Sequence, residues 1–141
     1  MSTDQSANQN TNLPGEVRVI DTRQGGRPGA AVLDNIEGAE YGAGVSLILE
    51  DTDVDGSGPA LHQHPYPETF VIHTGRALFT VADRQVVGEA GMVLVVPPFT
   101  PHKFAVIGPD RYRATHIHAN DRFITEWLEG PLARRVPPLQ T

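Results

Sequence analysis

The chain has 141 residues, of which 39% are hydrophobic, and it carries a net charge of −6 at pH 7 without a single cysteine. This length suits one domain, and the lack of cysteine excludes disulfide bonds, thiolate metal ligands and cysteine nucleophiles. The acidic balance argues against a nucleic acid partner. Because no apolar run approaches the length of a membrane span and no secretory signal is visible, we expect a cytoplasmic protein without membrane contact.

The chain is expected to consist of one domain between two tails. Residues 1–14 are polar and predict a flexible tail. Residues 15–130 form the predicted domain, and residues 131–141, which are rich in proline, form a second tail.

Short apolar segments separated by turn residues run through the predicted domain, at intervals of about ten residues. They predict strands near residues 45–49, 70–72, 78–82, 92–96, 102–106 and 111–118. The segment 92–96 is apolar throughout, which is typical of a strand that is covered on both faces. Only residues 125–129 are predicted to be helical, because Gly130 and Pro131 would end a helix there. The pattern indicates a small antiparallel sandwich or barrel.

Two histidines and a glutamate in the middle of the chain are candidate metal ligands. Successive side chains of an extended strand alternate between its faces, so His62, His64 and Glu68 would share one face. Two imidazoles and a carboxylate pack poorly in an apolar core but are good ligands for a divalent metal ion. His102 is the fourth candidate, since the prolines before it predict a rigid turn that presents its side chain at the start of a strand.

Two segments resemble the sequence motifs of the cupin superfamily. The first is Gly56-x5-His62-x-His64-x3-Glu68-x6-Gly75, which matches at every position. The second is Gly91-x5-Pro97-x-Phe99-x2-His102-x3-Val106, in which Phe99 replaces the usual glycine and Val106 the usual asparagine. The resemblance covers roughly residues 45–129.

This resemblance implies an all-β double-stranded β-helix, a jelly-roll-like barrel, here with one short C-terminal helix. It also implies that His62, His64, Glu68 and His102 bind one divalent metal ion. Iron(II), manganese(II), nickel(II) and zinc(II) all suit such ligands. Small cupins commonly form homodimers, which we therefore expect.

Three functions are compatible with such a site. The leading hypothesis is a metal-dependent enzyme that acts on a small organic molecule in the barrel, as an oxidoreductase of the dioxygenase type. The alternatives are a redox-neutral isomerase, cyclase or lyase, and a non-catalytic cupin that binds a small molecule or a metal. The fold does not decide among them.

Three further residues are candidates for a catalytic role. Arg111 and Arg113 prefer solvent, which would turn His116 and His118 inward, as partners of the metal ligands or as a general base. Alternatively, the two histidines lie at an interface or bond to neighbouring strands. Tyr66, between two prolines, is predicted to edge the mouth of the pocket. His73 is out of phase with the ligands and is expected to be exposed.

Overall fold

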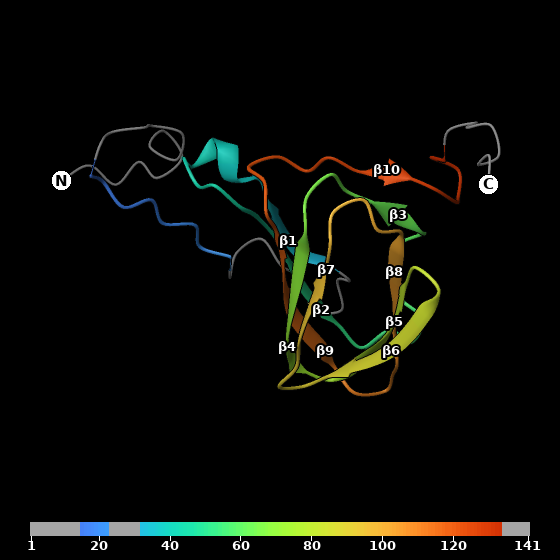
Figure 1. Cartoon of the computed structure of the whole chain (residues 1–141). Helices are drawn as coiled ribbons and strands as arrows, with labels where there is room; N and C mark the ends of the chain where they lie inside the picture. Colours follow the sequence, from blue (N-terminus) through green and yellow to red (C-terminus); the bar gives the residue numbers. More distant parts are fainter. Residues whose placement is uncertain (1–14, 23–31, 134–141) are drawn as a thin grey trace, which may run out of the picture.

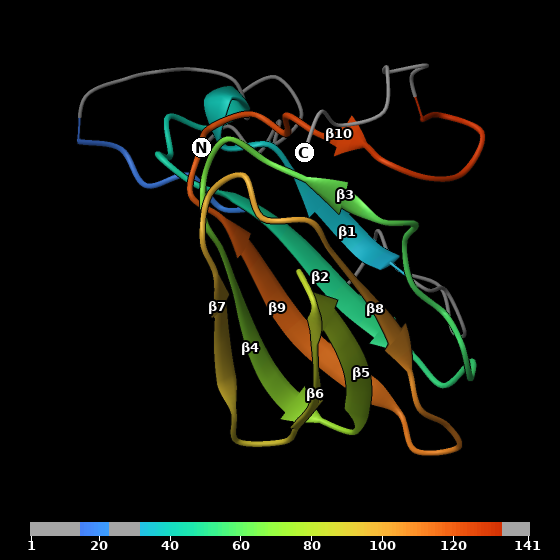
Figure 2. The same cartoon turned by 45° about the vertical axis from the view of Figure 1, so that its right-hand side comes forward.

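The computed structural model describes residues 15–22 and 32–133, and these form a barrel of two antiparallel sheets (Figures 1 and 2). The predicted tail 1–14 and residues 134–141 of the second tail lie outside the described residues. The first sheet contains, in order, β1 (Val32–Ile36), β2 (Ser46–Thr52), β9 (Tyr112–His118), β4 (Glu68–Thr74) and β7 (Val93–Val96). The second contains β10 (Glu126–Trp127), β3 (His62–Gln63), β8 (His102–Val106), β5 (Arg76–Val81) and β6 (Arg84–Glu89). The predicted all-β class is confirmed.

Alternating burial along the strands places one row of side chains between the sheets. In β9, for example, Tyr112, Ala114, His116 and His118 are buried and the residues between them are more exposed. At one end of the barrel the enclosed side chains are apolar, with Phe70 and Phe79 each about 1% exposed and their rings 5.0 Å apart. Truncating either ring to alanine would cost about 3–5 kcal/mol.

The pairing of β2, β9 and β4 arranges the inward-facing residues in successive layers. Ser46, His118 and Glu68 lie side by side in one layer. Ile48, His116 and Phe70 form the next layer, and Glu50, Ala114 and Ile72 the one after it. Each of these three layers therefore brings at least one polar side chain to the inside of the barrel.

The strand predicted at residues 92–96 exists as β7, but one of its faces is open to solvent, so the prediction that both its faces are covered is wrong. Val93 and Val95 are 60% and 62% exposed, whereas Val96 is buried. A continuous apolar run does not reveal whether other side chains pack on each face of a strand.

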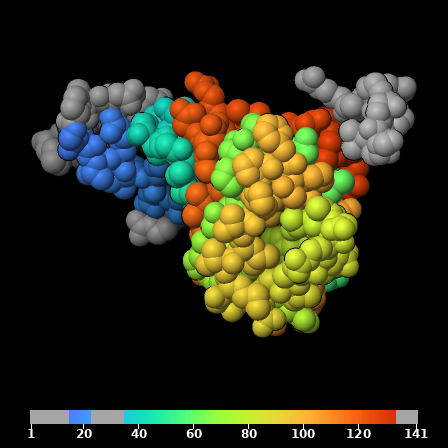
Figure 3. Space-filling model, viewed as in Figure 1, coloured from blue at the N-terminus to red at the C-terminus, as the bar shows by residue number. Residues whose placement is uncertain are grey.

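The helix predicted at residues 125–129 is also wrong. Glu126 and Trp127 form the strand β10, paired with Gln63 and His62 of β3. The pairing is extended by a hydrogen bond from the amide of Leu128 to the carbonyl of Leu61. These tertiary contacts override a weak local preference for helix. Figure 3 shows this segment, in orange to red, at one end of the barrel.

Within the described residues, the only helical element is a single 3-10 turn, η1 (Gly38–Glu40). No helix there is long and apolar enough to cross a membrane.

Candidate metal centre

The four predicted metal ligands converge on one point inside the barrel. His62, His64, Glu68 and His102 are all buried, and each offers a ligand atom that lies within 4.8 Å of the others. They come from both sheets: His62 of β3 pairs directly with His102 of β8, and Glu68 opens β4 in the opposite sheet. The fold thus brings together every residue that the sequence proposed as a ligand.

The route by which Glu68 reaches this point differs from the sequence interpretation, which placed it on the same strand as His62 and His64. The chain leaves β3 after Gln63 and enters β4 only at Glu68. Pro65 and Pro67 lie in between and lack the amide hydrogen that would continue a ladder. The chain therefore crosses from one sheet to the other there, and Glu68 faces the histidines across the barrel.

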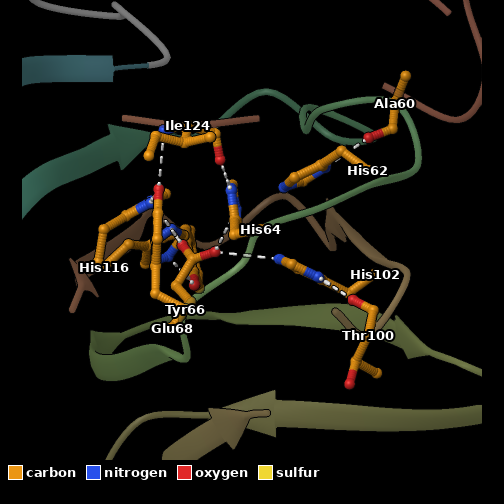
Figure 4. A network of polar contacts seen from close by, with 11 residues as sticks. Ala60, His62, His64, Tyr66, Glu68, Thr100, His102, His116 and Ile124 are labelled. Carbon is orange, nitrogen blue, oxygen red and sulfur yellow. Dashed lines mark hydrogen bonds and ion pairs between the residues drawn. The ribbon is translucent and has the colours of Figure 1, made fainter. Parts of the chain in front are cut away.

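Each of the three imidazoles is oriented by a backbone carbonyl. Nδ1 of His62 donates to Ala60 at 2.8 Å, Nδ1 of His64 to Ile124 at 2.9 Å, and Nδ1 of His102 to Thr100 at 2.8 Å (Figure 4). A carbonyl oxygen only accepts, so Nδ1 carries the proton in each ring. In the neutral ring, Nε2 then presents a free lone pair, which is how histidine ligands are commonly oriented.

The carboxylate of Glu68 lies among these imidazoles. Its Oε1 is 3.0 Å from Nε2 of His102 and 3.2 Å from Nε2 of His64. Burial acts to raise the pKa of Glu68, but hydrogen bonds from His102, His118 and His64, formed when the facing nitrogen carries a proton, outweigh it and hold that pKa well below its ordinary value. Glu68 is therefore an anion at neutral pH.

These residues fit a divalent cation. Lone pairs on neighbouring nitrogens and on an ionised carboxylate repel one another unless a proton or a metal ion lies between them. Nε2 of His64 is buried and makes no hydrogen bond among the described residues. Burial, ahead of the neighbouring histidines, lowers the pKa of His62 to about 4, so its ring is neutral at pH 7. A nitrogen and oxygen ligand set of this kind suits Fe(II), Mn(II), Ni(II) or Zn(II).

Phe99 keeps the turn before His102 although it replaces a glycine of the motif. Its φ angle is +56°, in the left-handed region that glycine adopts most easily. Its amide donates a hydrogen bond of 2.7 Å to the carbonyl of His64, and its ring is 66% exposed. The turn geometry is therefore retained. Val106, at the second departure, is buried in the apolar core.

His116 and His118 both point into the barrel, as one branch of the sequence interpretation predicted. Nε2 of His118 lies 3.1 Å from Oε2 of Glu68, and Nδ1 of His116 lies 3.9 Å from the same oxygen. Nε2 of His116 lies 3.0 Å from the hydroxyl of Tyr112, and burial lowers the pKa of His116 to about 4. Both rings thus lie near Oε2 of Glu68, whereas His64 and His102 lie near Oε1.

Tyr66 is buried against His64 and does not lie at the pocket mouth, where the sequence had predicted it. It is 6% exposed, stacks on His64 with ring centroids 4.9 Å apart, and is absent from the cavity wall. Its hydroxyl lies 2.7 Å from Nδ1 of His118 and accepts a hydrogen bond of 3.3 Å from the amide of Ile124. The structure therefore gives Tyr66 a supporting position. His73 is exposed, as predicted.

The candidate ligands form part of the wall of a cavity of about 420 Å³. The same wall contains His116 and His118 together with the apolar side chains of Ile48, Phe70, Phe104, Phe123 and Trp127. This is a size that accommodates a small organic molecule beside the metal position.

One ionisable residue of this wall was missed by the sequence interpretation. Glu50 lines the cavity and is 9% exposed. Burial, and then the charge of Glu68, raises the pKa of Glu50 to about 7. The sequence pattern predicts a strand that ends at Leu49. Continuing the alternation of Ser46 and Ile48 by one step would have turned Glu50 inward.

Comparison with known proteins agrees with this fold and site. Residues 49–124 match the family model described as "Cupin domain". The chain therefore belongs to the cupin family. A search of curated protein sequences finds no match.

Solved structures of oxalate-metabolising enzymes resemble the chain. The oxalate decarboxylase of Lactobacillus farciminis has a TM-score of 0.60 and 21% identity, and the match covers 67% of this chain and 30% of that one. An oxalate decarboxylase of Bacillus subtilis, described with Mn(II) centres, has a TM-score of 0.60, 22% identity and coverages of 67% and 27%. An oxalate oxidase in complex with glycolate has a TM-score of 0.60, 20% identity and coverages of 79% and 60%.

At these identities the likeness shows the fold alone. The chain spans less than two thirds of the length of each of the three proteins.

Proposed function

We propose that this protein uses one divalent metal ion to act on a small organic molecule inside the barrel, as an oxidoreductase of the dioxygenase type. The observation that carries the proposal is the convergence of three oriented imidazoles and one ionised carboxylate on the wall of a cavity. A structural metal site would be closed by protein ligands, whereas this one borders a space in which a substrate fits.

The residues of the chain would contribute in three ways. His62, His64, His102 and Glu68 would hold the metal ion, which supplies Lewis acidity and a position for substrate or dioxygen. The backbone carbonyls bonded to the three Nδ1 atoms fix the rings, so little reorganisation is needed on binding. The apolar side chains around the cavity exclude water from the reacting groups.

The names of the related structures support small-molecule chemistry at such a site. Two are oxalate decarboxylases, one of them described with Mn(II) centres, and one is an oxalate oxidase. Manganese, which one of these names mentions, and iron, which suits the same ligands, are the metals that we propose first. The homodimer and the cytoplasmic location stay predictions of the sequence.

The decisive experiment combines metal analysis with oxygen uptake. We expect about one equivalent of manganese or iron per chain in freshly purified protein, and oxygen consumption when a phenolic or enolic compound is added. Turnover that persists without oxygen would instead indicate redox-neutral chemistry. A metal-bound protein that returns every tested compound unchanged would indicate a binding protein.

A further inference from the structure

We infer that the cavity takes an uncharged, ring-containing molecule whose hydroxyl group bonds to Glu50, and that it discriminates against small dicarboxylates. The inference deepens the proposed function, on which it rests for the identity of the cavity as the substrate site, and it names the class of substrate. Three observations carry it: the position of Glu50, the charges of the cavity wall and the shape of its apolar part.

Glu50 is placed to contact the part of a ligand that lies away from the metal position. Along β2, the inward-facing residues are Ser46, Ile48 and Glu50, and Ser46 is level with Glu68 through the pairing of β2, β9 and β4. Glu50 is thus four residues farther along the strand, roughly 13 Å between backbone positions. A ring-sized molecule that touches the metal position can therefore direct a substituent toward Glu50.

The carboxyl of Glu50 has no bonded partner among the described residues. It is 9% exposed and borders the cavity. Burial and the charge of Glu68 raise its pKa to about 7, and no hydrogen bond from the described part of the chain offsets them. Its oxygens border the cavity and make no bond to the described residues, so the hydroxyl group of a ligand could supply one.

The charges of the wall disfavour an anion. The described residues that line the cavity include five histidines and two glutamates, Glu50 and Glu68, but no lysine or arginine. A dicarboxylate has two negative groups and needs cationic partners when it is removed from water. A divalent ion held by Glu68 leaves one net positive charge, so a bound dicarboxylate, with two negative charges, would leave one charge unbalanced in a wall that also contains Glu50.

The apolar part of the wall favours a ring. Phe70, Phe104, Phe123 and Trp127 line the cavity on several sides. Phe70 and Phe104 lie 6.4 Å apart in an edge-on arrangement. At this separation the two rings contact each other, and the aromatic side chains of the wall together present an apolar surface that a ring could cover. Oxalate, which has no apolar surface, gains nothing from this part of the wall.

Trp127 provides the readout for a binding test, because it lines the cavity and is the only tryptophan of the chain. Catechol and oxalate are titrated into the Zn(II)-loaded and the metal-free full-length protein, since zinc permits binding without redox turnover. We expect catechol to quench the fluorescence of Trp127 at concentrations at least tenfold lower than oxalate.

Glu50→Gln then tests the role of the carboxyl, with the exposed Glu129→Gln as the matched control. At pH 8, where Glu50 is ionised, we expect Glu50→Gln to weaken catechol binding several-fold and to strengthen oxalate binding about tenfold, because the amide keeps the shape and removes the charge. Glu129→Gln should change neither. Equal binding of both probes by the wild type, or unchanged affinities in Glu50→Gln, would overturn the inference.

The two proposals fail in distinguishable ways. Metal analysis tests the proposed function, because a protein that binds no metal cannot be the enzyme described above. The metal-free titration still measures the preference between catechol and oxalate, and with it the role of Glu50. A complete lack of quenching by catechol in both forms would overturn the inference even if the metal is bound.

Discussion

The hydroxyl group of Tyr66 lies 2.7 Å from Nδ1 of His118, and Nε2 of that ring lies 3.1 Å from Glu68. Because the Tyr66 oxygen accepts from the amide of Ile124, its own hydrogen can be donated to His118. The proton of the neutral imidazole then lies on Nε2, toward the carboxylate. The tyrosine therefore determines how His118 faces a candidate metal ligand.

Tyr66→Phe should weaken metal binding without removing any ligand. The change leaves Nδ1 of His118 and the amide of Ile124 without their partner, which costs about 1–3 kcal/mol of stability. Removing a partner of a metal ligand lowers metal affinity by roughly 10–100-fold, and we expect a smaller loss here because Tyr66 acts on the ligand Glu68 through His118. Metal titration and urea denaturation would measure both effects.

Tyr112→Phe is the matched control, because Tyr112 also bonds a buried histidine. His116, its partner, lies 3.9 Å from Glu68 and not 3.1 Å. We expect a similar loss of stability and a smaller loss of metal affinity. Equal metal affinities in the two variants would contradict the supporting role of Tyr66.

His62→Ala and His102→Ala should each lower metal content sharply, whereas His73→Ala should stay near the wild type. The first two remove a buried nitrogen that is oriented toward the common point, and the third removes an exposed ring bonded to Thr115. Elemental analysis after dialysis measures the difference. Equal metal content in all three variants would refute the assignment of the ligands.

The four metal ligands were predictable because the spacing of the two motifs identifies them. His62, His64, Glu68 and His102 were all named from the sequence, and they do come together. The prediction that Glu68 shares one strand face with His62 and His64 was nevertheless wrong, since the chain changes sheets between Gln63 and Glu68. Alternation along a strand cannot reveal that the strand has ended, and only the two prolines signalled it.

The remaining differences arise from contacts between distant segments. Glu126 and Trp127 became a strand because β3 offers a free edge to pair with, which no local preference encodes. The edge position of β7 depends on the order of strands in the sheet. Glu50 was missed because the predicted strand ended at Leu49, whereas β2 continues to Thr52 and turns Glu50 toward the cavity.

Two glycines of the cupin motifs should differ in their tolerance of a side chain. Gly75 and Gly91 have φ angles of +73° and +92°, so alanine is strained by roughly 1–2 kcal/mol at each. A Cβ atom at Gly75 would lie 2.5 Å from the carbonyl oxygen of Arg111, whereas one at Gly91 meets nothing within 4 Å. Crowding adds about 1–3 kcal/mol at Gly75 alone.

Urea denaturation of Gly75→Ala and Gly91→Ala would measure this difference directly. We expect both variants to be less stable than the wild type, and Gly75→Ala to be clearly the less stable of the two. The reverse order would show that the turn at Gly75 differs from the one described.

Phe99→Gly should be more stable than Phe99→Ala by about 1 kcal/mol, because only glycine adopts a φ angle of +56° without strain. The two variants lose the same largely exposed ring, so their difference isolates the backbone effect. Thermal or chemical unfolding would measure it. An alanine variant as stable as the glycine variant would mean that the turn between Pro98 and His102 relaxes to another conformation.

Glu50→Gln should stabilise the metal-free protein increasingly as the pH rises. The folded state raises the pKa of Glu50 from 4.5 to about 7, so the folded protein holds this proton more tightly than the unfolded chain does. Below pH 4.5 both states are protonated, and the carboxyl does not favour either one. Between pH 4.5 and about 7 the carboxyl ionises in the unfolded chain but stays protonated in the folded protein. The wild type therefore loses stability as the pH rises, by roughly 3 kcal/mol at pH 8.

Because glutamine does not titrate, the variant escapes this loss, and its advantage over the wild type should grow from near zero at pH 4 to its full size at pH 8. Glu129→Gln provides a control of opposite sign: Lys103 and the amide of Leu61 lower the pKa of Glu129, so its carboxylate stabilises the fold at neutral pH and stops doing so in acid. Urea denaturation at a series of pH values measures both trends. If the stability difference between Glu50→Gln and the wild type were the same at pH 4 and pH 8, the Glu50 carboxyl would be solvated in the folded protein. Glu50 would then not need a ligand hydroxyl as a partner.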